Sequence, residues 1–181
     1  FIVTSHGETF GDANGVFDQS ALLRSSLRSA LATADAVTAC SAFTAHDLES
    51  RFELSPGRAS IIANGVDLNE PTGGLPPDLP AHYFFALGRA VATKGFDLLL
   101  KAFASATLPS DAHLVIGGDG PELPALAELA AQLGVAERVR FLGSIGRGQV
   151  VAVAKGALAM VVSCRVESFG IVLLEGWRAG V

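Results

Sequence analysis

The stretch YFFALGRAVATKGFDLLLKAFASATLPSDAHLVIGG (83–118) predicts a strand, a helix and a second strand in succession. Its two ends, 83–88 and 113–118, are short runs rich in aromatic or branched apolar residues, and each stops at a glycine. Between them, residues 95–106 place apolar side chains at helical spacing. Such a unit is typical of two parallel strands joined by a crossover helix.

The same alternation continues on both sides of this stretch. Further strands are predicted at 1–5, 36–40, 59–64, 138–143 and 158–164, the last of them fully buried. Further helices are predicted at 20–34, 45–52 after a Ser41 cap, 122–134, 148–157 and 170–180. The pattern predicts an α/β protein with two Rossmann-like parallel-sheet domains.

A composition change separates these two domains. Residues 69–80, NEPTGGLPPDLP, hold four prolines and two glycines and few groups to bury, so we interpret them as a linker between domains 1–68 and 81–181. A doubly wound sheet rarely begins with a strand at its first residue, because each buried strand needs covered neighbours. We therefore expect both domains to be incomplete and the chain to be a fragment.

The composition excludes several classes of protein. The 181 residues carry a net charge of −5 and 13 Lys and Arg without a basic cluster, which argues against a nucleic-acid binder. No apolar run approaches the ~20 residues that span a bilayer, and the opening FIVTSHGETF is unlike a secretory leader, so we expect a cytoplasmic protein. Cys40 and Cys164 each end an apolar run, which is typical of small buried residues rather than of a disulfide or metal site.

Two cations follow the strand predicted at 83–88. Arg89 and Lys94 lie between Gly88 and Gly95, just before a predicted helix. Ligands of open parallel sheets bind beyond the carboxyl ends of the strands. A guanidinium, an ammonium and a helix N-terminus together suit a phosphate group, so these residues predict an anion site. The alternative is a pair of solvated surface cations.

The loops after the next two strands are rich in glycine. GGDGPEL (117–123) contains Gly118, where bare backbone suits close approach of a ligand, although a tight turn explains the sequence equally well. In FLG (141–143), the backbone of Leu142 is a candidate partner for the edge of a nucleotide base. The alternative is a core strand that stops at a glycine.

Two glutamates, Glu167 and Glu175, flank a Ser-Phe-Gly turn and an apolar run. A wholly helical 167–175 would separate them by ~12 Å, too far for one acid/base pair, so they would serve two ends of one long ligand. A carboxylate within an apolar helix needs donors such as the vicinal hydroxyls of a ribose for Glu175. Glu167 would face a hydroxylated ring at the start of the helix. The alternative is helix-dipole compensation by Glu167 and a solvent-facing Glu175.

These residues resemble the motifs of a known family. ESFGIVLLE (167–175) is similar to the E-x7-E motif of the retaining glycosyltransferases of family four, which have the two-domain GT-B architecture. Other family motifs match in order at NGVD (64–67), GR-x4-KG (88–95), GDGP (118–121) and FLG (141–143). The resemblance covers nearly the whole chain. One departure is Gly-Trp-Arg at 176–178, where the family usually has Ala-Met-Ala.

The resemblance implies roles on the donor side. Arg89 and Lys94 would hold the donor diphosphate and stabilise negative charge as the sugar–phosphate bond breaks, without a metal. Glu175 would bind the ribose, and Glu167 would bind hydroxyls of the donor sugar. The backbone that would cup the sugar and phosphate belongs to Phe169, Gly170, Ile171 and Val172, with Gly88, Gly118 and Leu142 as further donor-binding residues.

On the acceptor side, the resemblance implies a role for His6 and Gly7, which follow the first predicted strand. His6 is similar to the family's histidine that faces the acceptor and the donor sugar. The alternative is a capping or hydrogen-bonded structural histidine.

The resemblance implies a metal-independent, retaining enzyme that moves a sugar from a nucleoside-diphosphate sugar to a sugar, a lipid-linked sugar or a small molecule. The nucleotide sugar would be a substrate, so no cofactor is implied, and any peripheral membrane contact would use segments outside this sequence. A GT-B sugar-nucleotide epimerase and a non-catalytic sugar-nucleotide-binding module are the alternatives. Because the family's first strands would precede Phe1, we expect the 181-residue chain alone to transfer no sugar.

Overall fold

The computed structural model describes residues 1–11, 14–69 and 71–181, which form two compact units. The first unit comprises Phe1–Gly65 and Val166–Gly170, and the second comprises Val66–Arg165 and Ile171–Val181. The first unit thus ends just before the boundary predicted at residue 68, and it also takes in the segment that carries Glu167. Residue 70 of the predicted linker lies outside the described residues.

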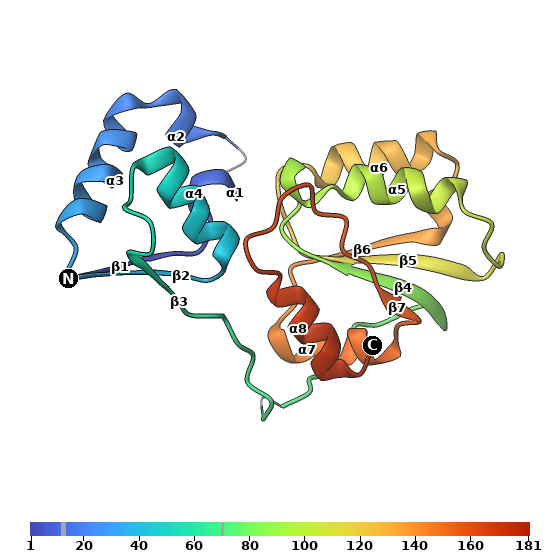
Figure 1. Ribbon diagram of the computed structural model, residues 1–181. Helices are drawn as coiled ribbons and strands as arrows, with labels where there is room; N and C mark the ends of the chain where they lie inside the picture. Colours follow the sequence, from blue (N-terminus) through green and yellow to red (C-terminus); the bar gives the residue numbers. More distant parts are fainter. Residues whose placement is uncertain (12–13, 70) are drawn as a thin grey trace. The chain divides into compact units, whose positions relative to one another are not determined.

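The first unit is built on a small parallel sheet with the strand order β1-β2-β3 (Figure 1). Its strands are β1 (Ile2–Ser5), β2 (Ala36–Ala39) and β3 (Ala59–Ile61). Its helices are α1 (Glu8–Gly11), α2 (Val16–Gln19), α3 (Ala21–Thr33) and α4 (Ala42–Phe52). Parallel pairing with helices between the strands confirms the α/β prediction for this unit.

The two longest helices of this unit begin at serine caps. The Ser41 hydroxyl accepts a hydrogen bond from the Thr44 N–H at 3.1 Å, as predicted, and the Ser20 hydroxyl accepts one from the Leu23 N–H at 3.3 Å. Each cap is worth ~1 kcal/mol because it satisfies a backbone donor that the helix leaves free. The apolar faces of these helices and of the sheet meet in a core of Leu31, Ala34, Val37, Leu48, Phe52 and Leu54.

The second unit is built on a four-stranded sheet, also parallel, with the order β6-β5-β4-β7. Its strands are β4 (His82–Leu87), β5 (Ala112–Gly117), β6 (Val139–Gly143) and β7 (Ala159–Met160). Its helices are α5 (Phe96–Ser105), α6 (Leu123–Gln132), α7 (Arg147–Gly156) and α8 (Ile171–Ala179), with 3-10 turns η1 (Ala92–Lys94) and η2 (Ala136–Arg138).

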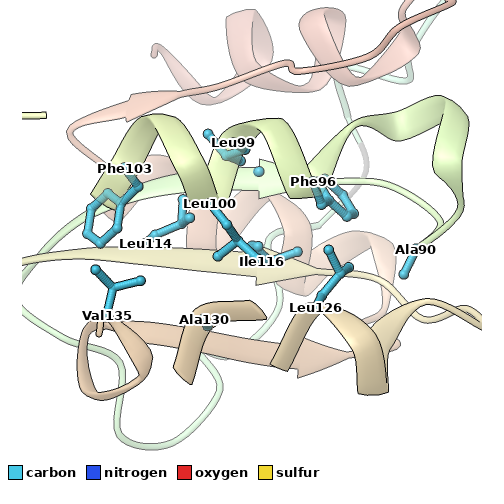
Figure 2. Close-up of a cluster of buried hydrophobic side chains, with 11 residues drawn as sticks. Ala90, Phe96, Leu99, Leu100, Phe103, Leu114, Ile116, Leu126, Ala130 and Val135 are labelled. Atoms are coloured by element: carbon cyan, nitrogen blue, oxygen red, sulfur yellow. The ribbon is translucent and has the colours of Figure 1, made fainter. Parts of the chain in front are cut away.

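Helices cover both faces of this sheet, with α5 and α6 on one side and α7 and α8 on the other (Figure 1). Side chains alternate between the faces along β5: Leu114 and Ile116 pack against α5 and α6, whereas Val115 packs against α7. All three are fully buried, which explains the apolar run Leu114–Ile116 within the strand predicted at 113–118. Figure 2 shows the first of these cores, where Phe96, Leu100 and Phe103 of α5 face Leu126 and Ala130 of α6 across the strand residues.

The strand order contains a topological switch point. The chain builds β4, β5 and β6 outward in one direction and then returns to place β7 on the other side of β4. Because all the strands are parallel, the loops that follow β4 and β7 leave the same edge of the sheet next to each other. In open α/β sheets this edge is where ligands bind.

The prediction of a fully buried strand at 158–164 is wrong. Only Ala159 and Met160 form β7, and both are partly exposed, as are Leu158 at 55% and Val162 at 38%. β7 pairs with β4 alone and so forms an edge of the four-stranded sheet, where one flank has no neighbouring strand among the described residues.

The α8 helix is also less buried than its apolar sequence suggests. Ile171 and Leu173 are more than 40% exposed and Trp177 is 72% exposed, whereas Gly176 is buried. A Cβ atom at Gly176 would lie 2.9 Å from the Met160 Sδ, so the glycine allows α8 to approach β7 closely. Among the described helices, none is long and apolar enough to cross a membrane.

Candidate functional site

Glycines allow the loops after β4 and β5 to pass close to each other. The Gly88 N–H donates to the Gly117 carbonyl at 3.1 Å, and the Gly118 N–H donates to the Gly143 carbonyl at 2.7 Å. Gly118 has a φ of +113°, and a Cβ at this position would lie 2.0 Å from the Gly88 carbonyl oxygen. Position 118 therefore requires glycine, because backbone contacts backbone there.

The predicted phosphate-binding cations lie at this edge of the sheet. Arg89 is exposed and comes two residues after β4, and Lys94 is half-buried at the end of η1. The aliphatic part of Lys94 packs over Gly88, where an added Cβ would lie 3.4 Å from the Lys94 Cδ. The structure thus brings Gly88, Lys94 and Gly118 together, with Arg89 on the same loop.

The predicted helix after Gly95 is α5, and its first turn carries a carboxylate. Asp97 lies in the first turn, and its two carboxylate oxygens accept hydrogen bonds from Nη1 and Nη2 of Arg165. The hydrogen bond from Arg165 is the largest cause that lowers the pKa of Asp97 to about 2. The negative charge of Asp97 already lies at the positive end of the α5 helix dipole. A phosphate here would therefore depend mainly on the Arg89 and Lys94 side chains.

Sequence reasoning missed Gly120 and the part played by Ala90. The Ala90 N–H donates to the Asp119 carbonyl at 2.9 Å, and the Ala90 carbonyl accepts from the Glu122 N–H at 3.1 Å. A Cβ at Gly120 would lie 2.4 Å from that carbonyl oxygen. Hydrogen bonds between backbone groups therefore hold the loops after β4 and β5 together. The second glycine of GDG (118–120) was the available signal for this contact.

Leu142 and Glu175 also belong to the second unit. Leu142 lies in β6, with its side chain packed against the core beneath α7, and the strand ends at Gly143 with a φ of +63°. Glu175 lies in the second turn of α8 and is half-buried. Ile171 and Val172 form the first turn of the same helix.

The first unit holds the other predicted residues, His6, Gly7, Glu167, Phe169 and Gly170. His6 is exposed directly after β1, and its backbone N–H donates to the Glu8 carboxylate at 2.8 Å. Gly7 is buried with a φ of +95°, and a Cβ there would lie 2.4 Å from the Ser168 Cβ. Gly7 thus lies beside the segment that carries Glu167.

The segment Val166–Gly170 is bound through Ser168 within the first unit. The Ser41 hydroxyl donates to the Ser168 carbonyl at 2.6 Å, and the Ser168 N–H donates to the Glu167 Oε1 at 3.1 Å. The two glutamates are therefore not on one helix, because α8 begins at Ile171 and includes only Glu175. Ser41 serves both this segment and the cap of α4, a double role that no sequence pattern indicated.

Metal-binding side chains do not cluster in the part of the chain that the structure describes. In residues 1–11, 14–69 and 71–181, no group of three or more His, Cys, Asp or Glu side chains could hold a metal ion. Cys40 is buried, as predicted, whereas Cys164 is half-buried because it follows the partly exposed edge strand β7.

Comparison with proteins of known family gives matches over both units. Residues 75–181 match the model described as glycosyl transferases group 1, and residues 1–70 match the model described as glycosyltransferase family 4. A D-inositol 3-phosphate glycosyltransferase of Mycolicibacterium gilvum is 37% identical over 150 residues, which cover 75% of this chain and 33% of that protein. A GDP-mannose-dependent alpha-(1-6)-phosphatidylinositol monomannoside mannosyltransferase of Mycobacterium tuberculosis is 32% identical over 200 residues, covering 99% of this chain and 50% of that protein. The chain thus spans half or less of the length of these relatives.

Solved structures agree on the fold. Sucrose-phosphate synthase from Thermosynechococcus elongatus matches with a TM-score of 0.77 at 22% identity, covering 99% of this chain and 48% of that one. HepE of Anabaena, in complex with UDP and glucose, matches with a TM-score of 0.73 at 22% identity, covering 99% of this chain and 50% of that one. These likenesses confirm the predicted GT-B fold class. The model described as glycosyl transferases group 1 matches more than half of the residues of this chain, so the chain belongs to that family.

Proposed function

We propose that this chain is part of a retaining glycosyltransferase that moves a sugar from a nucleoside-diphosphate sugar to an acceptor hydroxyl. One observation carries the proposal: Arg89 and Lys94 follow β4 at the switch point of the β6-β5-β4-β7 sheet. Ligands of open α/β sheets bind at such points, and two cations there suit a diphosphate. Membership of the family supplies the reaction class.

The donor is a nucleotide sugar in this proposal. HepE of Anabaena has been solved with UDP and with UDP-glucose, and the mycobacterial mannosyltransferase is described as GDP-mannose-dependent. Both donors contain a diphosphate between a ribose and a sugar. We therefore propose a nucleoside diphosphate as the shared part of the donor, with a sugar, a lipid-linked sugar or a small molecule as the acceptor.

Arg89 and Lys94 stabilise the leaving group in this mechanism. The bond between the donor sugar C1 and the diphosphate oxygen breaks, and its electron pair stays on that oxygen. The acceptor oxygen forms the new bond to C1 from the same face, and the departing phosphate takes the acceptor proton. Two fixed cations beside the diphosphate lower the energy of the charge that develops. No separate cofactor or metal takes part in the proposed step.

The remaining residues would bind parts of the donor and the acceptor. Glu175 accepts hydrogen bonds from the two ribose hydroxyls, and Glu167 accepts them from the donor sugar. The backbone of Phe169, Gly170, Ile171 and Val172 donates to the sugar and phosphate, the loops of Gly88 and Gly118 line the phosphates, and the Leu142 backbone meets the base. His6 and Gly7 would face the acceptor.

Acceptor-dependent release of nucleoside diphosphate tests this proposal. A full-length enzyme that contains this chain would be incubated with UDP- and GDP-sugars, with and without candidate acceptors, in the presence of EDTA. We expect release only with an acceptor, and a product whose anomeric configuration by NMR matches that of the donor. Conversion of the donor without an acceptor would indicate an epimerase, and tight binding without turnover would indicate a binding module. Neither alternative is favoured by the family assignment.

A further inference from the structure

The segment that follows β7 is hydrogen-bonded to the turn that carries Lys94. Arg165 Nη1 donates to the Ala92 carbonyl at 2.8 Å, and the Arg165 backbone N–H donates to the Thr93 carbonyl at 2.8 Å. The Ser163 hydroxyl donates to the carbonyl of Lys94 itself at 2.9 Å. Three consecutive carbonyl oxygens of one turn are thus held by a segment some 70 residues further along the chain.

The Arg165 guanidinium is in turn oriented by Asp97. Its Nη1 and Nη2 donate to the two carboxylate oxygens of Asp97 at 2.7 Å and 2.8 Å, a bidentate geometry. Asp97 lies in the first turn of α5, directly after the turn that carries Lys94. The same Nη1 therefore links a helix of the core to the Ala92 carbonyl. This pairing lowers the pKa of Asp97 to about 2 and raises that of Arg165, so both groups stay charged at neutral pH.

Close packing supports these hydrogen bonds. Gly95, which joins the turn to α5, has a φ of +65°, and a Cβ there would lie 2.2 Å from the Ser163 carbonyl oxygen. The backbone at Gly95 and the backbone at Ser163 are therefore in direct contact, with no room for a side chain between them.

We propose that Arg165 and Asp97 are positioning residues for Lys94, because they fix the main chain from which its side chain extends. This inference rests on the proposed function of Lys94. A charge stabiliser is effective when it is held in place before the reaction, and small displacements cause large losses of rate. Lysine cannot replace Arg165, because a single ammonium cannot bind both carboxylate oxygens and the Ala92 carbonyl with the geometry of a guanidinium fork.

A double-mutant cycle in the full-length enzyme separates positioning from general stability. Arg165→Lys should lower kcat about tenfold and change the donor KM by less than about threefold, because only the transition state needs Lys94 in place. In the Lys94→Ala background, Arg165→Lys should lower kcat less than about twofold, since no ammonium remains to be positioned. Asp97→Asn, which keeps the shape but not the charge, should show the same pattern. Arg147→Lys on the exposed start of α7 is the matched control and should leave kcat unchanged.

Hydrogen exchange supplies a readout that does not depend on activity. The amides of Lys94 and Gly95 donate to Val91 and Ala92 at 2.9 Å and 3.2 Å, so their exchange reports opening of the turn. Arg165→Lys should speed their exchange and leave the amide of Leu100 in the core unchanged. Unchanged exchange of Lys94 and Gly95 would overturn the inference.

The kinetic outcomes separate the inference from the proposed function. Equal losses of kcat from Arg165→Lys with and without Lys94 would overturn the inference and leave the proposed function intact. Wild-type turnover by Lys94→Ala would overturn both.

Discussion

The two edges of the sheet in the second unit carry different kinds of polar group. At the amino edge, His82, Asp111, His113 and Arg140 line a cavity of about 670 Å³. Some of its polar groups bond to one another or to nearby backbone: His82 Nδ1 lies 2.7 Å from the Asp111 carboxylate, and Arg140 Nη2 donates to the Pro77 carbonyl at 3.0 Å. At the carboxyl edge, backbone hydrogen bonds join the glycine-rich loops, and Arg89 and Lys94 lie on the loop after β4.

Chain topology and charge favour the carboxyl edge as the candidate site, although the cavity of about 670 Å³ lies at the amino edge. Imidazoles and carboxylates that pair with each other have less capacity left for a ligand. Cations beside a switch point, on a turn fixed from several sides, suit a preorganised phosphate site. The comparison makes the carboxyl edge the candidate site despite the cavity at the other edge.

The largest expected effect contrasts a cation of the carboxyl edge with an imidazole of the amino edge. In the full-length enzyme, Lys94→Ala and Arg89→Ala should each lower kcat by ~10²-fold or more, the scale for removal of one preorganised charge stabiliser. His82→Ala, at the opposite edge, should change kcat by less than about twofold. Steady-state kinetics with a saturating donor would measure all three variants. A larger loss from His82→Ala than from Lys94→Ala would reverse the assignment of the site.

The next prediction compares the loss of stability when a glycine near each edge of the sheet is replaced by alanine. Gly134, before β6 and near the amino edge, has a φ of +71° and nothing within 4 Å of an added Cβ, so Gly134→Ala should lower the free energy of unfolding by ~1 kcal/mol through backbone strain alone. Gly118→Ala adds a collision with the Gly88 carbonyl and should lose a further ~1–3 kcal/mol. Urea titration of the 181-residue chain, followed by circular dichroism, would measure both. Equal losses would contradict the close backbone contact at the carboxyl edge.

Much of this fold could be predicted from the sequence, because short strand-like runs alternate along the chain with segments of helical spacing. The runs at 83–88, 113–118 and 138–143 each fall within one residue of β4, β5 and β6. The run at 158–164 has the same appearance but forms only the short edge strand β7, because burial depends on neighbouring strands that local sequence does not specify.

The part of the candidate site that follows β4 could be predicted from its position after a strand. Arg89 and Lys94 were found from their position after the strand predicted at 83–88, and their roles remain predictions. The Arg165–Asp97 pair was not predicted, because its members lie 68 residues apart and only the placement of β7 beside β4 brings them together. Hydrogen bonds of this kind follow from strand order, which no single motif encodes.

A third effect, of about tenfold, concerns ligand binding by the glutamates. In the full-length enzyme, Glu175→Gln should weaken both the free nucleoside diphosphate and the nucleotide sugar about tenfold, the loss of one charge-assisted hydrogen-bond partner. Glu167→Gln should spare the free nucleotide and weaken only the nucleotide sugar. Titration calorimetry with both ligands would measure this, with Glu137→Gln at the amino-edge cavity as the matched control. Identical losses for the Glu175 and Glu167 variants with both ligands would contradict their assignment to two ends of one donor.

The smallest effect compares the ion pairs of the two edges as the pH falls. At the carboxyl edge, the hydrogen bonds from Arg165 lower the pKa of Asp97 to about 2 in the folded chain, below its ordinary value of 3.8. A lowered pKa stabilises the folded state fully above the ordinary value, and this stabilisation is lost as the pH falls through the folded value. The difference in unfolding free energy between the wild type and Asp97→Asn should therefore be constant above about pH 4 and shrink between pH 4 and pH 2.

The amino edge supplies the control for this pH dependence. The hydrogen bond from His82 lowers the pKa of Asp111, but both side chains are more than half exposed, so water and salt screen this pair more strongly. The contribution of Asp111 should therefore fade when salt is raised, whereas that of the bidentate Asp97 pair should persist, because a fixed fork depends less on long-range charge. Urea titrations of the 181-residue chain and of Asp97→Asn and Asp111→Asn at several pH values, in low and high salt, would measure this. If salt removed both contributions equally, the Arg165–Asp97 pair would be an ordinary surface ion pair, and the carboxyl edge would be no better ordered than the amino edge.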